Sequence, residues 1–355
     1  FQGSRGLGDV YKRQIKHHFC GVFFYTYTMD SSLTGITTTG TPHLGNYVGA
    51  IKPAIQLSKK FKSYLFLADY HSLIKVNDPE AVKESSMKIA ATWLACGLDS
   101  KNSLFYRQSK VPQILELNWI LSCMAPKGLL NRAHAYKAAV DLNKENKNDE
   151  DYGISHGLFS YPVLMSADIL MFNPKYVPVG KDQKQHLEIT RDIADKFNKT
   201  YKNFFQLPEP IIDESLDLLT GTDGRKMSKS YNNSIDLFSS EKILQKSINK
   251  IKTDSKEPGE KKETKDSIIF QYFNHFSDEE EINDIKKEFD DGIGWGDAKK
   301  KLFTKINQEI SPLRDKYFDL INNPKLIEDT LEAGETLARE EANKNLEQIK
   351  EKIGI

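Results

Sequence analysis

Short apolar runs alternate with amphipathic stretches over the first two thirds of the chain. The pattern places strands at 33–37, 64–69 and 104–106, and helices at about 43–61, 78–97, 112–123 and 182–200. Asp78 and Pro79 have the residue types of a helix N-cap and a first helical position. Ile189, Ile193 and Phe197 lie four apart, on one face of the last of these helices. Strands and helices in alternation predict a parallel sheet covered by helices on both faces.

Strand-like runs stop after about residue 234, and helical patterns then continue almost to the C-terminus. One interruption, the charged stretch 253–266 with Pro and Gly, predicts a solvated loop. We therefore expect an α/β fold with a second, all-helical domain. The expected units are a parallel-sheet domain at 29–234, a helical domain at 235–325 and a C-terminal helix at 326–355 that packs back on the sheet domain.

Residues 1–28 stand apart from this pattern. The first four residues, FQGS, are typical of the scar of a cleaved affinity tag, and basic residues then lead into an apolar run at 19–27. That run is far shorter than the roughly 20 residues of a membrane span. We interpret 1–28 as a tag scar followed by a non-native or organelle-targeting extension, with Met29 as the natural start.

Composition narrows the possible functions. The 50 Lys and Arg residues balance 50 Asp and Glu residues, so a nucleic-acid partner would have to meet a local basic patch. The three cysteines are scattered without metal-site spacing, which indicates a reducing, cytoplasmic location and no metal centre. Beyond residue 28 we expect no segment that spans a membrane.

A turn of small residues follows the first predicted strand and leads into a helix. In open α/β sheets, ligands bind beyond the carboxyl ends of the strands, glycine lets a nucleotide approach the backbone, and helix amides attract phosphate. His43 would lie where it can donate to a phosphate oxygen. Taken alone, the turn fits a nucleotide site and an ordinary structural turn equally well. The residues concerned are Thr37, Thr38, Thr39, Gly40, His43, Gly45 and Asn46.

A glycine-led loop at 224–230 carries two lysines on either side of a serine. Lys226 and Lys229 would form a mobile cationic clamp for polyphosphate, because lysine is a compact point charge. Such a clamp stabilises a transition state in which charge moves onto a leaving pyrophosphate. A lysine-rich exposed loop is the plain alternative, but this loop and the His43 turn occur in one chain, in order. Together they predict an ATP-consuming active site.

The two motifs resemble signatures of the class I aminoacyl-tRNA synthetases. The letters HLGN at 43–46 are similar to the HIGH signature, and KMSKS at 226–230 matches the second signature letter for letter. The resemblance implies a Rossmann-type catalytic domain that joins an amino acid to ATP, with Mg²⁺ carried by the nucleotide, and then esterifies tRNA. It assigns catalysis to His43, Asn46, Lys226 and Lys229, and it places Met227, Ser228 and Ser230 with the turn residues at the ATP.

A single carboxylate, Asp168, lies inside the apolar segment 161–170. A buried acid must be paired or hydrogen-bonded, so Asp168 is either a helix N-cap or salt-bridge partner, or an acceptor for a substrate N–H. The segment resembles the tryptophan-binding region of bacterial tryptophanyl-tRNA synthetases. That resemblance makes Asp168 the acceptor for the indole N–H, Met165 a ring contact and Tyr161 a contact of the substrate amine. It adds Val177, Val179, Gln183 and His71 to the tryptophan site, and Gly180, Lys181 and Asp182 to the ATP site.

Departures from the family concern the ATP loop. Three threonines at 37–39 stand where the family has Gln-Pro-Ser, and Lys181 replaces a glutamate. After Lys137, where many relatives carry a second triphosphate-contacting lysine, this chain has two alanines; the sequence leaves open whether Lys144 or Lys147 takes that place.

The resemblance also implies partners: L-tryptophan, ATP, tRNA(Trp) bound by the helical domain at its anticodon, and a second copy in a homodimer. Between 241 and 265, eight lysines against five acidic residues fit a tRNA contact and an ordinary solvated helix face alike. Two other functions stay open. A tyrosyl enzyme shares this fold, but a phenol needs more polar partners than Met165, Ser166 and Ala167 provide. A non-catalytic synthetase-like RNA-binding protein is the other, in which the two signatures are usually eroded.

Overall fold

Five parallel strands form a single sheet. The structure is a computed structural model, and it describes residues 30–38, 40–180, 183–212 and 219–355. The strands are β1 (Ser31–Thr37), β2 (Lys62–Ala68), β3 (Ser103–Arg107), β4 (Tyr176–Pro178) and β5 (Glu209–Ile211), in the order β3-β2-β1-β4-β5. The expected α/β fold is confirmed, and the three predicted strands occur with bounds shifted by one or two residues. The two three-residue strands β4 and β5 were not predicted, because such short runs carry little periodicity.

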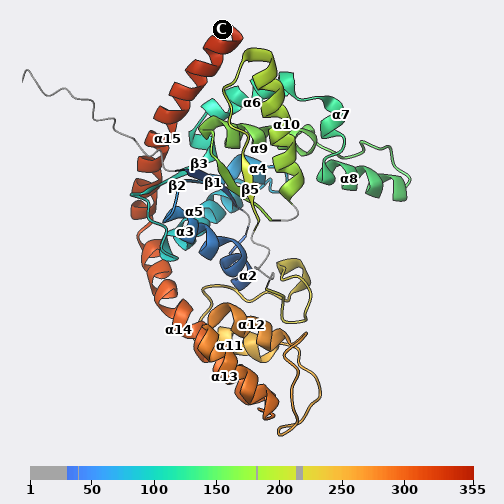
Figure 1. Cartoon of the computed structure of the whole chain (residues 1–355), viewed down its shortest axis with the longest axis vertical. Helices are drawn as coiled ribbons and strands as arrows, with labels where there is room; N and C mark the ends of the chain where they lie inside the picture. Colours follow the sequence, from blue (N-terminus) through green and yellow to red (C-terminus); the bar gives the residue numbers. More distant parts are fainter. Residues whose placement is uncertain (1–29, 39, 181–182, 213–218) are drawn as a thin grey trace, which may run out of the picture.

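Helices cover both faces of the sheet and make up the C-terminal part of the chain (Figure 1). Around the sheet these are α2 (Leu44–Asn46), the π-helical η1 (Tyr47–Ile51), α3 (Lys52–Ser58), α4 (Asp69–Ser72), α5 (Pro79–Ala95), η2 (Gln108–Lys110), α6 (Gln113–Met124), α7 (Lys127–Leu130), α8 (His134–Glu145), α9 (His156–Phe172) and α10 (Lys184–Tyr201). They are followed by η4 (Lys229–Tyr231), α11 (Glu241–Asn249), α12 (Ile268–Phe276), α13 (Glu279–Asp290), α14 (Trp295–Asn322) and α15 (Pro324–Ile353).

Local sequence explains where helix α5 begins and why another helical run is irregular. The Asp78 side chain accepts the Glu80 N–H at 3.0 Å, and Pro79 follows as the first residue of α5, as predicted. The helical run expected over 43–61 is confirmed over residues 44–58, but it is not one regular α-helix. It is divided by the π-helical turn η1 and ends at Ser58, and Pro53, which has no N–H to donate, lies where the hydrogen-bond ladder changes.

Strand β2 separates two hydrophobic cores. Leu65 and Leu67 pack on one face with residues of α3 and α5, whereas Tyr64 and Phe66 pack on the other with residues of α6, α9 and α10. Successive side chains of a strand point to opposite faces, and burial of each such side chain contributes about 1.5–3 kcal/mol. The continuous apolar run at 64–68 is thus the signature of a strand covered on both sides.

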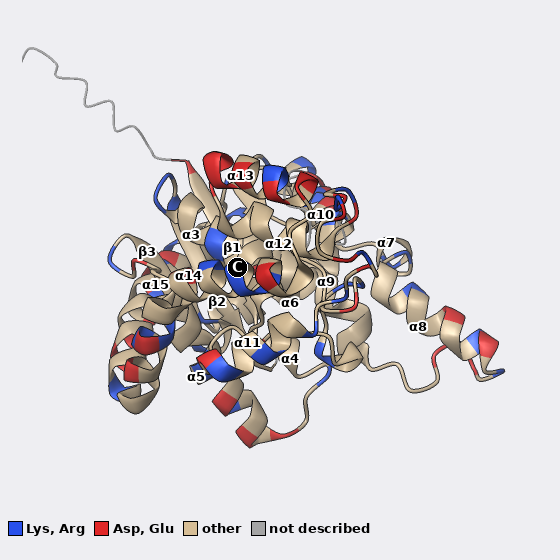
Figure 2. Ribbon diagram, turned by 90° about the horizontal axis from the view of Figure 1, so that it is seen from below, with Lys and Arg blue, Asp and Glu red and all other residues tan. Residues whose placement is uncertain are grey.

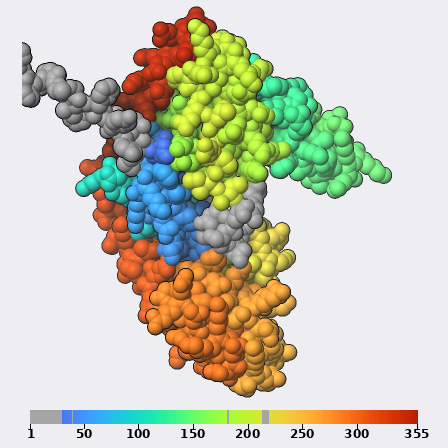
Figure 3. Space-filling view, viewed as in Figure 1, coloured from blue at the N-terminus to red at the C-terminus, as the bar shows by residue number. Residues whose placement is uncertain are grey.

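The helical region shares the first of these cores. Phe273 of α12 and Leu302 of α14 belong to the same buried cluster as Leu65 of the sheet. Figure 3 shows this region as an orange lobe beside the sheet domain, and Figure 2 shows basic and acidic residues interspersed along α8 and α13. Among the described residues, no helix is long and apolar enough to cross a bilayer.

Lys262 corrects the prediction of a solvated loop at 253–266. Most of this stretch is exposed, but the Lys262 side chain is fully buried. Its Nζ donates to the carbonyl oxygens of Glu257 at 2.8 Å and Glu260 at 3.0 Å, and it lies 5.6 Å from the centre of the Trp295 ring. These partners replace the water that a buried ammonium loses. Because Lys262 is buried, it does not add to the excess of surface lysines predicted at 241–265.

The C-terminal helix α15 crosses the edge strand β3 at backbone contact. A Cβ added to Gly334 would lie 2.0 Å from the carbonyl oxygen of Phe105, so only glycine fits the crossing. In Figure 1, α14 and α15 run one after the other along one side of the molecule. Glycine costs about 1 kcal/mol inside a helix, and here it permits the close approach of helix and strand.

Replacing Gly334 with alanine is expected to lower the free energy of unfolding by about 1–3 kcal/mol, because the methyl group must push α15 away from β3. Urea unfolding followed by circular dichroism measures the change. Gly296→Ala in α14 is the matched control, since no atom lies within 4 Å of a Cβ built there. Equal unfolding midpoints for the two variants would contradict the crossing described.

Candidate active site

All five parallel strands end at one edge of the sheet, and the segments that follow four of them carry residues of the site. The register pairs Thr37 with Ala68 and Leu67 with Arg107, so the carboxyl ends of β1, β2 and β3 lie together. The strand order reverses between β1 and β4, which is where open α/β sheets bind ligands. The segments that leave this edge are 38–46, 69–72, 108–110 and 179–180.

His43 begins helix α2 and is held by Asn46. Its Nδ1 accepts the Asn46 N–H at 3.2 Å, and its own N–H donates to Asn46 Oδ1 at 3.0 Å. Burial and the positive charge of Lys229 lower the pKa of His43, against the opposing effect of Asp236. A neutral imidazole that accepts at Nδ1 carries its proton at Nε2. His43 can therefore donate one hydrogen bond from Nε2 while it caps the helix.

The lysine loop folds over the His43 turn. Lys229 Nζ donates to Thr41 Oγ1 at 2.6 Å, and the buried Met227 accepts the Gly45 N–H at its Sδ, at 3.4 Å. Gly40 has a φ of 69°, and a Cβ there would lie 3.3 Å from Lys229 Nζ. At Gly45 a Cβ would lie 3.1 Å from the His43 ring. The glycines thus let two motifs that are far apart in the sequence meet at one place.

Asn233 holds the lysine loop in shape. Its buried side chain accepts the Ser228 N–H at 2.8 Å and donates to the Lys226 carbonyl at 3.1 Å and to Asp223 Oδ1 at 2.7 Å. This last hydrogen bond, together with the hydrogen bonds and the charge of Arg225, lowers the pKa of Asp223 to about 2. The Ser228 and Ser230 hydroxyls lie 2.8 Å apart. Lys226 and Lys229 remain exposed on this fixed backbone, where their charges can meet an anionic ligand.

Asp168 is fully buried on α9, with partners from two strand ends. Its Oδ2 lies 2.8 Å from His71 Nε2, and Gln108 Nε2 donates to Oδ1 at 2.7 Å and to Oδ2 at 3.0 Å. Burial raises the pKa of the Asp168 carboxyl, and the hydrogen bonds from His71 and Gln108 act against this rise. The N-cap alternative is excluded, because α9 begins with Ser155 as its N-cap.

The other candidates of the tryptophan site lie on α9, β4 and the start of α10. Tyr161, Met165 and Asp168 are four and three residues apart, so they share one face of α9. The Tyr161 hydroxyl lies 2.5 Å from His186 Nε2, its ring meets the His71 ring edge-on at 6.3 Å, and burial raises its pKa. In addition, Val177 is buried on β4, Val179 and Met165 are half-buried, and Gln183 is the N-cap of α10.

Some candidate residues of the ATP site lie outside the described residues, and others are exposed to solvent. Thr39, Lys181 and Asp182 lie outside the described residues. Thr37 and Gly180 are exposed at strand ends, whereas Thr38 is buried. The Thr38 Oγ1 has no hydrogen-bond partner among the described residues, which leaves a polar atom to be satisfied at the turn.

Three residues of this site were missed by reasoning from the sequence: Gln108, Thr41 and Asn233. Gln108 follows directly on a predicted strand, so the rule that ligands bind at carboxyl ends could have found it. Thr41 lies inside the predicted turn, and its hydroxyl group was the only sequence feature that could have indicated a role in the site. No sequence feature indicated Asn233, because its role depends on where the loop folds back.

Residues 30–311 match the family described as tRNA synthetases class I (W and Y). The chain therefore belongs to the class I aminoacyl-tRNA synthetases for tryptophan and tyrosine, as its motifs indicated. Over 326 residues it is 53% identical to a Tryptophan–tRNA ligase of Neisseria meningitidis, which covers 91% of this chain and 97% of that protein.

Solved structures agree with this assignment. The crystal structure of tryptophanyl-tRNA synthetase from Campylobacter jejuni, complexed with ADP and tryptophan, has a TM-score of 0.82 and 43% identity, with 92% of this chain and 100% of that chain covered. A tyrosyl-tRNA synthetase from Archaeoglobus fulgidus, with a TM-score of 0.63 and 16% identity over 82% of this chain and 91% of that one, shares the fold alone.

Proposed function

We infer that the protein activates L-tryptophan with ATP to tryptophanyl-adenylate and pyrophosphate, and then transfers tryptophan to tRNA(Trp). The observation that carries this inference is the buried Asp168 carboxylate, held by His71 at the same sheet edge at which Lys229 reaches Thr41. The Asp168 carboxylate suits a single N–H donor inside an apolar pocket, and the Lys229 ammonium group suits a polyphosphate. The 53% identity to a Tryptophan–tRNA ligase supports the same activity.

Tryptophan recognition rests on a hydrogen bond in a dry pocket. The indole N–H donates to Asp168, Met165 and Val177 pack on the ring, and Tyr161 and Gln183 meet the amino-acid end. A site built around a buried acceptor rejects an analogue without the donor by roughly 10⁴–10⁵, because the acceptor is then left unpaired. This selectivity separates indole from phenyl.

Activation is a displacement at the α-phosphate of ATP. The tryptophan carboxylate forms a bond to phosphorus, and pyrophosphate leaves with the electron pair of the broken bond. His43 donates from Nε2 to a phosphate oxygen, while Lys226 and Lys229 neutralise charge on the pyrophosphate. Neither a side-chain nucleophile nor a general base is needed, so the protein acts by positioning both substrates.

Magnesium enters as part of the ATP substrate in this proposal. Among the described residues, no group of three or more His, Cys, Asp or Glu side chains is arranged to hold a metal ion. The triphosphate oxygens are hard ligands that bind Mg²⁺ well, and magnesium commonly keeps several waters and phosphates in such sites. The ion supplies charge neutralisation at the phosphates.

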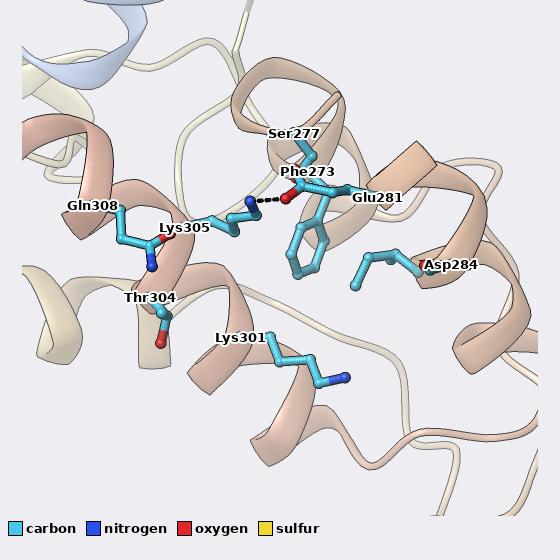
Figure 4. Close-up of a pocket in the computed structure, with 9 residues that line it drawn as sticks. Phe273, Ser277, Glu281, Asp284, Lys301, Thr304, Lys305 and Gln308 are labelled. Atoms are coloured by element: carbon cyan, nitrogen blue, oxygen red, sulfur yellow. Dashed lines mark hydrogen bonds and ion pairs between the residues drawn. The ribbon is translucent and has the colours of Figure 1, made fainter. Parts of the chain in front are cut away.

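The helical region is the proposed contact for the tRNA anticodon. A cavity of about 390 Å³ opens between α12, α13 and α14, with Phe273 as one apolar wall (Figure 4). Ile285 also lines it. Lys305 forms an ion pair with Glu281 at its edge, and Lys301 and Asp284 also line it. Unpaired bases are recognised by apolar contact and by hydrogen bonds at their edges, with lysines on the phosphates.

A homodimer through the sheet domain is proposed from exposed apolar residues on α6. Leu115 and Trp119 lie four apart on one face of this helix, and Trp119 is 71% exposed. Tryptophan is enriched at protein interfaces and costly to leave in water. Sedimentation velocity at micromolar concentration tests the assembly, and a monomer under those conditions would argue against it.

A cytoplasmic location is proposed, because ATP and tRNA for protein synthesis are found there. Cys96 and Cys123 carry free thiols, in keeping with a reducing compartment. Detection of the native protein in an organelle fraction alone would contradict this location.

Pyrophosphate exchange into ATP with each aromatic amino acid tests the activity. We expect exchange with L-tryptophan and, at equal concentration, at least about 10³-fold less with tyrosine or phenylalanine, because neither presents the indole N–H. Exchange with tyrosine but not tryptophan would establish the tyrosyl alternative instead. Binding of tRNA without exchange for any amino acid would establish a non-catalytic RNA-binding protein.

Transfer to tRNA tests the second step separately. Radiolabelled tryptophan should become acid-precipitable with tRNA(Trp), and an altered anticodon should lower kcat/KM for tRNA while exchange stays unchanged. If the altered anticodon had no effect, the helical region would lose its proposed role, although the activation step would stand.

A further inference from the structure

Gln108 occupies a fully buried position between β3 and Asp168. It is the first residue after β3, and both ends of its side-chain amide are engaged: Nε2 by Asp168 and Oε1 by the Tyr70 N–H at 3.1 Å. A carboxylate only accepts hydrogen bonds and a backbone N–H only donates, so these two partners fix which end of the amide is which. The side chain therefore has one orientation.

This orientation determines how Asp168 presents its oxygens. The two hydrogen bonds from Gln108 and the one from His71 put two donors on Oδ2 and one on Oδ1. A carboxylate oxygen can accept two hydrogen bonds, so Oδ1 keeps a place for a further donor. Without Gln108, the carboxylate would lose a charge-assisted hydrogen bond in a place that water does not reach.

The C-terminal helix α15 contacts the chain on both sides of Gln108. Before it, Gly334 packs on Phe105, and Arg107 Nε donates to the buried Glu335 at 2.5 Å and Nη1 pairs with Glu328 at 2.9 Å. The guanidinium of Arg107 is thus held between two carboxylates of one helix.

After Gln108, the same helix makes a further contact. Arg339 Nη1 donates to the carbonyl oxygen of Lys110, the last residue of η2, at 3.2 Å. Three consecutive turns of α15 therefore hold the backbone that carries Gln108, and α15 follows α14 of the helical region with only Asn323 between them.

We propose that Gln108 is a positioning residue for tryptophan selection, and that α15 holds it in register through β3, so that the C-terminal helix contributes to amino-acid specificity. This proposal rests on the proposed function, in which Asp168 accepts the indole N–H. Gln108 acts through Asp168, whose two oxygens it holds in place by its hydrogen bonds, and does not itself contact the substrate. The helix α15 acts one step further away, through Arg107.

The first test replaces Gln108 by methionine, which has a similar shape but cannot donate to Asp168. We expect the KM for tryptophan to rise about tenfold or more, with kcat and the KM for ATP within about twofold. Selectivity against the benzothiophene analogue of tryptophan, in which sulfur replaces the N–H, should fall by a similar factor. Gln245→Met on α11 is the matched control, because that side chain is exposed and lies outside both the site and α15.

A conservative variant separates positioning from folding. In Gln108→Glu, a protonated carboxyl can still donate to Asp168, whereas an ionised one repels it. We expect the KM for tryptophan to approach the wild-type value as the pH is lowered and to rise with pH more steeply than in the wild type. His71, Asp69 and Tyr106 also act on Asp168, but they are the same in both proteins, so the difference reports on Gln108.

The role of α15 is tested by a double-mutant cycle. Glu335→Gln should raise the KM for tryptophan severalfold in the wild type but have little further effect when combined with Gln108→Met, because both act through one amide. Equal effects in both backgrounds would overturn the role of α15. Unchanged KM and selectivity in a folded Gln108→Met protein would overturn the role of Gln108. Absence of tryptophan-dependent exchange in the wild type would instead refute the proposed function.

Discussion

Replacing Asp168 with asparagine should lower kcat/KM for tryptophan by about 10²–10³, almost entirely through a higher KM. The indole N–H would lose a charged acceptor inside a site that is closed to water, where such a hydrogen bond is strongest. The KM for ATP should change little, because the contacts of the lysine loop do not involve Asp168. Pyrophosphate exchange with varied tryptophan and varied ATP measures both constants.

The folded state should survive this change. Burial raises the pKa of Asp168, so its carboxyl group binds a proton more tightly in the folded protein than in the unfolded chain. As the pH rises above the ordinary pKa of an aspartate, the Asp168 carboxyl therefore destabilises the fold increasingly. A neutral amide of the same shape removes that cost. Asp192→Asn on α10, which is exposed, is the control for a lost carboxylate. A folded Asp168→Asn protein with the wild-type KM for tryptophan would remove Asp168 from the pocket.

Replacing Lys229 with alanine should lower kcat for tryptophan-dependent exchange by about 10²–10³, with the KM for tryptophan within about threefold. The ammonium group neutralises charge that develops on the leaving pyrophosphate, and a methyl group cannot replace it. Lys242→Ala on α11 is the control, since this exposed lysine lies outside the loop and exchange requires no tRNA. An unchanged exchange rate would show that Lys229 takes no part in activation.

The Lys229→Ala protein offers a second, independent measurement. The Lys229 charge contributes to the lowered pKa of His43, so its removal should raise the pKa of His43 toward the ordinary histidine value. Titration of the His43 ring by NMR follows this change without any activity assay. If the pKa of His43 stayed the same, the lysine loop would not lie over the His43 turn in solution.

The sequence by itself determined the fold class and the chemistry of two motifs. The alternation of short apolar runs and helical patterns predicted a parallel sheet, because the periods of strands and helices are local properties of the chain. KMSKS, a stretch of five letters, indicated a polyphosphate clamp, and Asp168 indicated a buried acceptor because a charge inside an apolar segment needs a partner. The domain bounds and the roles of the individual site residues stay predictions.

Only the tertiary structure decided which residues complete these sites. Gln108 and Thr41 act on groups that are distant in the sequence, and Asn233 acts on a loop that folds back to it from five to ten residues earlier; no local pattern records such contacts. Lys262 is an ordinary surface lysine by composition, but it becomes buried where the carbonyl groups of Glu257 and Glu260 and the indole face of Trp295 converge. Partners of this kind are selected by the path of the folded chain, because hydrogen bonds depend on distance and direction in space.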